Sequence, residues 1–182
     1  ILTGCTVDGI EKHDDWYTSH LSNGSSIASD KVMFAIGRHP AVANLGLEKA
    51  GVAINPDNGG IAVNEASQSS VPHIYAVGDV THRFNLTPVA IREGHAFADT
   101  IFGKRAVKVD HIDIPTAVFT QPQVGTVGVT EAQARAQFAI VDVYKAAFRP
   151  LKATLSGSES RVLMKLVVDA GSDRVVGCHI VG

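Results

Sequence analysis

The sequence lacks the local patterns that mark several classes of protein. Its two cysteines, Cys5 and Cys178, form no CxxC or CxxxxC spacing, so neither a redox pair nor half of a zinc site is present. The eight histidines are scattered, with no i, i+4 pair and no ligand at metal spacing, so we expect no metal site. No apolar run reaches eighteen residues and no basic block occurs, so we expect no membrane span and no nucleic-acid partner.

The composition that remains is typical of a soluble globular protein. Of the 182 residues, 45% are hydrophobic and 19% charged, with a net charge of -2, which is enough for one core or two small ones. The few cysteines, with no secretory signal in these residues, favour a cytoplasmic location. Because the chain starts with Ile1 and its last residues, Val175 to Gly182, read as an unfinished strand, we expect it to be a piece of a longer protein.

The first third of the chain predicts strands. Residues 1–30 alternate polar and apolar segments around Asn23-Gly24, a hairpin turn signal, which predicts a small antiparallel meander. Lys31 to Ile36 (KVMFAI) is a nearly continuous apolar run, typical of a strand buried on both faces, and it ends at Gly37.

Residues 38–73 are rich in proline, glycine and asparagine, so we expect a connector with short strands, of which Ile61 to Val63 is the best. His73 to Val77 (HIYAV) predicts a second buried strand, which runs directly into Gly78 and Asp79.

The clearest helix signal follows. Thr87 has the features of an N-cap, Pro88 suits the first helical position, and Gly103 suits the stop. One face of this helix is expected to be apolar, with Val89, Ala90, Phe97, Ile101 and Phe102.

After Ile112 the pattern predicts a mostly antiparallel sheet with one covering helix. Thr130 and Gln133 have capping-box spacing and open that helix, which runs to about Phe138. Strand-like segments surround it, and Ala170 to Arg174 reads as a hairpin between the last two. The expected strands are Thr116 to Thr120, Thr126 to Val129, Val141 to Phe148, Val162 to Val168 and Val175 to Val181.

Three short features could carry chemistry. A buried strand that ends in Gly78-Asp79 and leads to a helix is where open α/β sheets place ligands, although a simple turn explains the same spacing. The helix start at Thr87 offers backbone N–H groups and partial positive charge to an anion or an electron-rich ring edge, as every helix start does. At Gly37-Arg38, a glycine and a fixed positive charge just after a strand would let a nucleotide approach the backbone closely. The alternative is a simple strand end with a solvated arginine.

The order of several motifs is more specific than any one of them. AIGRHP, IYAVGD, LTPVAIREG, IPTAVFTQPQVGTVGVTE, VLMKLVVD and VVGCHIVG follow one another in the chain. In this order they resemble the pyridine-nucleotide–disulfide oxidoreductases over essentially the whole chain. Within that family, LTPVA and FRPLKATLSG resemble the glutathione reductase type more than the dihydrolipoamide dehydrogenases.

This resemblance implies an NADPH-dependent flavoprotein that contains FAD, reduces glutathione disulfide and forms a homodimer through its C-terminal domain. It implies a cofactor-binding set in which Asp79 contacts the flavin ribityl chain, Thr87 begins the helix that faces the isoalloxazine, and Gly37 lies near the nicotinamide nucleotide. The whole set is Gly37, Gly78, Asp79, Asn85, Leu86, Thr87 and Ala117.

The substrate assignment is less complete. Glutathione reductases often place an arginine where His95 stands, so another disulfide such as trypanothione, or a mercuric ion, is the alternative substrate. Phe148 and Leu151 match positions that in such enzymes line the disulfide pocket of the partner subunit, and they could equally be core residues. A non-catalytic dimerisation or binding module is the alternative outside enzymes.

The resemblance also implies which parts are outside these residues. The first flavin-binding glycine fingerprint, the redox-active CxxxxC, the nicotinamide-nucleotide fingerprint and the C-terminal His-Pro-Thr are all absent here. We therefore expect no catalytic residue within the chain and no reductase activity from it alone.

The expected fold class is α/β plus α+β, in three parts. Residues 1–37 would end a nucleotide-binding domain, residues 38–110 would close a Rossmann-like FAD domain, and residues 111–182 would form a truncated dimerisation domain.

Overall fold

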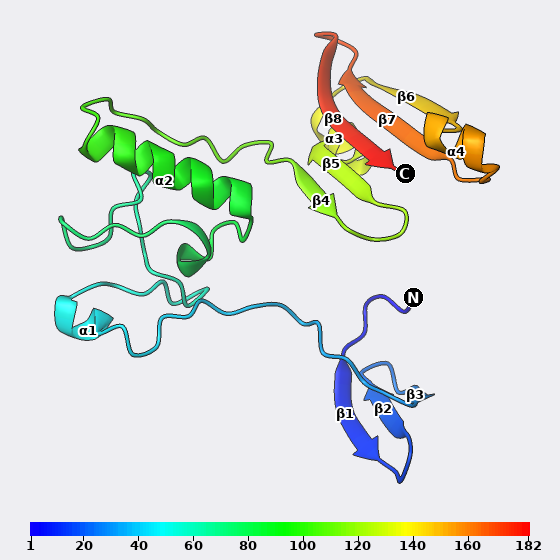
Figure 1. Ribbon diagram of the computed structural model, residues 1–182, viewed down its shortest axis with the longest axis horizontal. Helices are drawn as coiled ribbons and strands as arrows, with labels where there is room; N and C mark the ends of the chain where they lie inside the picture. Colours follow the sequence, from blue (N-terminus) through cyan, green and yellow to red (C-terminus); the bar gives the residue numbers. More distant parts are fainter. The chain divides into compact units, whose positions relative to one another are not determined.

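The computed structural model describes all residues from Ile1 to Gly182. The chain divides into two compact units, residues 1–106 and 107–182 (Figure 1). The finer division at residues 37 and 110 stays a prediction.

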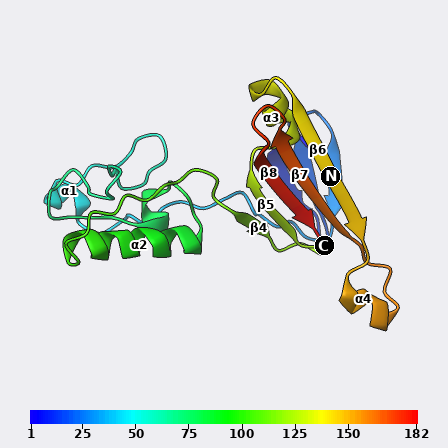
Figure 2. The same ribbon diagram turned by 90° about the horizontal axis from the view of Figure 1, so that it is seen from above.

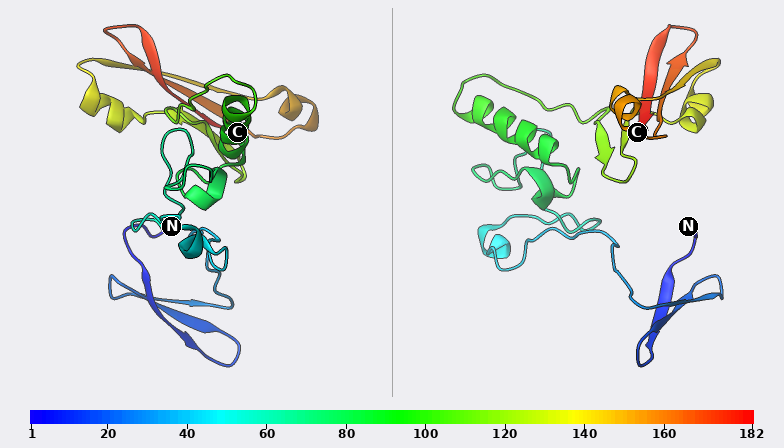
Figure 3. Two further views of the ribbon diagram at one scale, coloured as in Figure 1. Left: turned by 90° about the vertical axis from the view of Figure 1, so that its left-hand side faces the viewer. Right: turned by 45° about the vertical axis from the view of Figure 1, so that its right-hand side comes forward.

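The first residues form the predicted meander. Its strands are β1 (Val7–Lys12), β2 (Tyr17–Leu21) and β3 (Ser26–Ser29), which pair antiparallel in the order β1-β2-β3 (Figure 3). Asn23 and Gly24 lie in the turn between β2 and β3, where Gly24 has a φ of 83°. This positive φ favours glycine, so the turn signal in the sequence has its expected cause.

The predicted buried strand over Lys31 to Ile36 is wrong for this chain. These residues belong to no strand, and the side chains of Met33 and Ile36 are 86% and 90% exposed. A strand buried on both faces needs paired neighbours at its edges and layers above and below it, and no segment of residues 1–106 supplies them.

The other short strands predicted in the first unit are also reduced. Within His73 to Val77 only Tyr75 makes a bridge, to Gln68, and within Ile61 to Val63 only Ile61 does, to Ile54. The apolar character of these segments still has a role, because Val52, Ile61 and Ala76 form the core of this region. Partly buried residues pack around that core: Val42, Leu47, Val63, Val71, Ile74 and Val80.

Helical segments complete the first unit. A short helix α1 (Leu47–Ala50) lies in the connector, and the 3-10 helix η1 (Gly78–Thr81) follows residues 73–77. The longer helix α2 (Thr87–Ile101) packs against η1 (Figure 1). The predicted N-cap is displaced by one residue. Leu86 is the N-cap and makes no side-chain cap bond, while Thr87 is already helical.

The buried face of α2 differs from the predicted one. Val89, Glu93 and Ala96 are buried, whereas Ile101 and Phe102 are 41% and 76% exposed. The spacing of four and then three residues is that of one helix face, so a glutamate occupies a position that the apolar pattern reserved for the core.

The second unit confirms the predicted antiparallel sheet with a helix. Five strands pair in the order β4-β5-β8-β7-β6, and every pairing is antiparallel (Figure 2). The strands are β4 (Thr116–Val118), β5 (Val124–Gly128), β6 (Val141–Phe148), β7 (Val162–Asp169) and β8 (Arg174–Val181).

Two helices accompany this sheet. Helix α3 (Glu131–Gln137) begins with the predicted capping box and packs on β6 and β7, with Ala134 fully buried. A further helix, α4 (Leu151–Ser156), follows β6 and was not predicted from the sequence. The core of this unit includes β7, which pairs with β8 and β6 and contains the fully buried Val167.

Candidate functional site

The turn at Gly78 and Asp79 exposes a carboxylate on a tightly packed support. Gly78 is buried with a φ of 70°, and a Cβ added there would lie 2.8 Å from the Cβ of Ala90 in α2. Glycine is therefore required, both for the backbone conformation and for the close approach of the helix. Thr81 closes the turn by donating a hydrogen bond from Oγ1 to the carbonyl of Gly78 at 2.8 Å. The next residue, Asp79, carries an exposed side chain.

Asp79 lies in a hollow of about 260 Å³ that brings separate segments together. Arg38 and His39 contribute to it from the segment after Gly37, and His82 and Asn85 from the segment between η1 and α2. The hollow thus combines a carboxylate, a guanidinium, two imidazoles and an amide, a set suited to a ligand that carries hydroxyl groups and negative charge.

Three further predicted residues of the first unit, Gly37, Leu86 and Thr87, stand next to or near residues that line the hollow in the sequence. Gly37 is exposed with a φ of 110°, a backbone conformation that favours glycine. Leu86 is half-buried and Thr87 is exposed at the first turn of α2, where helix N–H groups carry partial positive charge.

Ala117 lies in β4 of the second unit, with an exposed side chain. Its predicted place near a nucleotide stays a prediction.

The predicted substrate residues are all exposed but lie in different units. His95 is on α2, Phe148 ends β6 with 42% exposure, and Leu151 begins α4 with 88% exposure. Phe148 and Leu151 are therefore not part of the core within residues 1–182, and their place in a disulfide pocket stays a prediction. Each is available to a ligand or to another surface.

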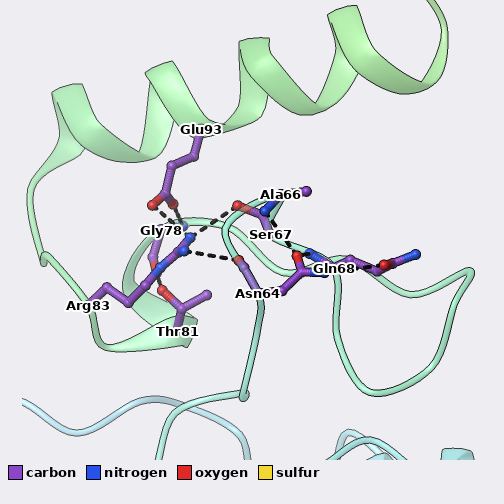
Figure 4. A network of polar contacts seen from close by, with 8 residues as sticks. All are labelled: Asn64, Ala66, Ser67, Gln68, Gly78, Thr81, Arg83 and Glu93. Atoms are coloured by element: carbon purple, nitrogen blue, oxygen red, sulfur yellow. Dashed lines mark hydrogen bonds and ion pairs between the residues drawn. The ribbon is translucent and has the colours of Figure 1, made fainter. Parts of the chain in front are cut away.

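Sequence reasoning missed an ion pair beside the Gly78 turn. Glu93 is 2% exposed, and Arg83 Nη2 donates to its Oε1 at 2.8 Å (Figure 4). Glu93 Oε2 accepts the backbone N–H of Gly78 at 2.7 Å. A signal existed in the sequence, because Glu93 stands four residues after Val89 and four before Phe97, on the face predicted to be buried.

Other parts of the molecule offer less. Both cysteines are free, and no three or more His, Cys, Asp or Glu side chains are grouped as metal ligands would be. A larger hollow of about 690 Å³ in the second unit contains Lys152 and Arg161 but none of the predicted site residues. None of the helices combines the length and the apolar character needed to cross a membrane.

Comparison with known protein families places both halves of the chain. Residues 1–94 match the family described as pyridine nucleotide-disulphide oxidoreductase, and residues 114–182 match the pyridine nucleotide-disulphide oxidoreductase dimerisation domain.

Individual relatives are similar over most of the chain. It is 51% identical over 179 residues to glutathione reductase of Burkholderia cepacia, covering 98% of this chain and 40% of the relative. It is 50% identical to the chloroplastic/mitochondrial glutathione reductase of Pisum sativum, covering 88% of this chain and 29% of the relative. Trypanothione reductase of Trypanosoma congolense is 45% identical, with 100% and 37% covered. The chain thus spans at most 40% of the length of these three relatives.

Solved structures agree with this comparison. The HOCl-induced flavoprotein disulfide reductase RclA from Escherichia coli matches with a TM-score of 0.83 at 28% identity. The match covers 96% of this chain and 40% of that protein.

Proposed function

Because the chain belongs to the pyridine nucleotide-disulphide oxidoreductase family, we propose that it is part of an FAD-containing, NADPH-dependent reductase that acts on glutathione disulfide. The observation that carries this proposal is the exposed carboxylate of Asp79. The turn that holds it contains the buried Gly78 and packs against α2. The share of the relatives that the chain covers supports a longer enzyme, with the redox-active dithiol outside residues 1–182.

The residues of the hollow fit a flavin nucleotide. The Asp79 carboxylate can accept hydrogen bonds from ribityl hydroxyl groups. The first turn of α2, at Leu86 and Thr87, supplies partial positive charge for the electron-rich edge of an isoalloxazine. Asn85 lies at the rim of the hollow, with Nδ2 3.4 Å from His82 Nδ1, and offers an amide to the same ligand or to a nicotinamide.

The nicotinamide nucleotide is assigned to the segment around Gly37. Its exposed backbone permits close approach, and Arg38 beside it provides a fixed positive charge. We assign Ala117 to the same cofactor on the family resemblance, and its exposed position in β4 is compatible with that role.

The reaction balances as NADPH plus a proton plus glutathione disulfide giving NADP⁺ and two molecules of glutathione. FAD, when bound, supplies the redox chemistry by which the two electrons of the hydride reach the disulfide. The role of the present residues is to bind and orient the cofactors.

The substrate and its partner surface are part of the same proposal. His95, Phe148 and Leu151 are assigned to the disulfide pocket, and their exposure supports contact with a substrate or a second subunit. The match to a dimerisation domain over residues 114–182 supports a homodimer, and so do exposed side chains on its sheet such as Tyr144 and Leu163. We place the protein in the cytoplasm because of its low cysteine content.

Trypanothione disulfide is the second candidate substrate. It is favoured by the 45% identity to trypanothione reductase of Trypanosoma congolense and by His95, which stands where an arginine is expected for glutathione.

A turnover assay on the full-length protein that contains residues 1–182 tests the proposal. NADPH oxidation is followed with glutathione disulfide and with trypanothione disulfide, and then with NADH in place of NADPH. We expect the highest kcat/KM with NADPH and glutathione disulfide. NADPH oxidation no faster than a blank without protein, for either disulfide, would overturn the proposed activity.

A substitution at His95 tests the pocket. His95→Arg places a guanidinium where a glutathione carboxylate is expected, so KM for glutathione disulfide should fall by about 3- to 30-fold with little change in kcat. Ala98→Arg, at another exposed position of the same helix, is the matched control and should leave KM unchanged. Equal effects of the two variants would remove His95 from the substrate pocket.

A further inference from the structure

Glu93 is a buried carboxylate whose two oxygens serve different segments. It projects from the middle of α2, with Oε2 2.7 Å from the backbone nitrogen of Gly78 and Oε1 2.8 Å from Arg83 Nη2. Figure 4 shows the carboxylate above the Gly78 turn, with the Arg83 guanidinium beside it. The helix and the turn are therefore joined through one side chain.

Arg83 extends this connection to a third segment. Its Nη2 also donates to Ser67 Oγ at 3.0 Å, and its Nη1 lies 3.4 Å from the carbonyl oxygen of Asn64 (Figure 4). Ser67 is itself buried, so Nη2 lies between two buried acceptors, Ser67 and Glu93. These contacts fix the position of the Arg83 guanidinium beside the Glu93 carboxylate.

Stabilisation alone is a poor explanation for this pair. Burying the Glu93 carboxylate costs much of what its attraction to Arg83 returns, although the Arg83 side chain keeps 23% of its surface exposed, and an apolar residue of similar volume often serves as well at such a position. The Nε of Arg83 is also buried without a hydrogen-bond partner, which adds a cost. The geometry that this ion pair imposes is therefore the more informative feature.

That geometry concerns the residues assigned to the flavin. Gly78 N–H belongs to the residue immediately before Asp79, and Glu93 lies on the helix whose first turn contains Thr87. Resting on the proposed FAD-binding function, we propose that Glu93 is a positioning residue. Glu93 fixes the turn that contains Asp79 relative to α2, and Arg83 holds the Glu93 carboxylate in place. Asp79 and the first turn of α2 can then contact the same flavin, Asp79 at the ribityl chain and the helix start at the ring.

The test compares FAD binding to the full-length apoprotein in a set of variants. Glu93→Ala removes both contacts, whereas Glu93→Gln retains an acceptor for the Gly78 N–H. We expect the Kd for FAD to rise at least about tenfold in Glu93→Ala, less in Glu93→Gln, and not at all in Glu48→Gln, an exposed glutamate of α1 that serves as control.

A double-mutant cycle separates positioning from general structural damage. If Glu93 acts through Asp79, the Glu93→Ala change should raise the Kd by less than about threefold in an Asp79→Ala background. The bound-flavin absorption bands should shift in Glu93→Ala and keep their wild-type positions in Glu48→Gln. The same fold loss in both backgrounds would show a merely structural role and overturn the proposal.

The remaining outcomes are also decisive. If Glu93→Ala does not fold, the same cycle is run with Glu93→Gln, whose amide preserves volume, and wild-type Kd in that variant together with unshifted bands overturns the inference. A wild-type protein that does not bind FAD refutes the proposed function. A wild-type protein that binds FAD and loses affinity with Asp79→Ala, but not with Glu93 variants, refutes only the positioning role.

Discussion

Replacing Gly78 by alanine is the substitution whose effect follows most directly from the structure. Gly78 has a φ of 70°, and a Cβ there would lie 2.8 Å from the Cβ of Ala90, well inside ordinary van der Waals contact. The left-handed conformation costs alanine about 1 to 2 kcal/mol, and an overpacked contact adds about 1 to 3 kcal/mol. We therefore expect Gly78→Ala to loosen the packing of η1 on α2 by roughly 2 to 5 kcal/mol.

Hydrogen exchange read by mass spectrometry on peptides from residues 87–101 measures this local effect. Since each 1.4 kcal/mol is a factor of ten, exchange of the protected α2 amides should quicken by about 30- to 4,000-fold. Gly94→Ala is the control, because a Cβ there meets no atom within 4 Å, and alanine should slow exchange slightly in a helix. Adding Ala90→Gly to Gly78→Ala should recover part of the loss. Unchanged exchange in Gly78→Ala would refute the close packing of the turn against the helix.

Two further substitutions probe the start of α3. Lys165, and after it Arg135, hydrogen-bond to Glu131 and lower the pKa of its carboxyl from 4.5 to about 2. The ionised Glu131 carboxylate therefore stabilises the fold above pH 4.5, and this contribution is lost as the pH falls toward 2. Between pH 4.5 and 2 the free energy of unfolding, measured by urea denaturation, should fall more steeply in wild type than in Glu131→Gln. Parallel pH profiles of the two proteins would contradict this. Thr130→Ala removes the cap that accepts the N–H of Gln133 and should lower stability by about 1 kcal/mol in urea denaturation, with Thr130→Ser close to wild type; a silent Thr130→Ala would mean that the capping box contributes nothing.

The second unit could be predicted well because its signals are local. The hairpin between β7 and β8, the capping box at Thr130 and the alternation over Val141 to Phe148 each involve neighbours in sequence. Such patterns specify turns and pairing without reference to distant residues. The sheet of residues 114–182 therefore follows from the sequence almost strand by strand.

The first unit was predicted less well because its strands depend on partners. Lys31 to Ile36 has the composition of a central strand, yet composition does not supply the neighbouring strands that would pair with it. The exposed Met33 and Phe34 that result are consistent with surface that a longer chain would cover. An apolar run in the sequence identifies a segment that should be buried, but it does not show whether the strands that would pair with that segment are present.

The candidate site shows the same limit in another form. Asp79 and Thr87 could be named from local motifs, and the hollow joins Asp79 to Arg38, more than forty positions earlier in the chain. The position of Glu93 on the buried helix face could be seen in the sequence, but its role could not, because a glutamate is rarely buried unless it is paired and its partners are distant in sequence. Its burial follows from Arg83 and the Gly78 N–H, two partners that only the fold brings together.

The most direct test of the central claim is an anaerobic absorption titration of the full-length protein that contains residues 1–182. The account predicts a protein with the visible bands of bound FAD, which are bleached by NADPH and restored by glutathione disulfide. It also predicts that Asp79→Ala weakens retention of the flavin. A colourless protein that takes up no added FAD, or flavin bands that NADPH does not bleach, would contradict it.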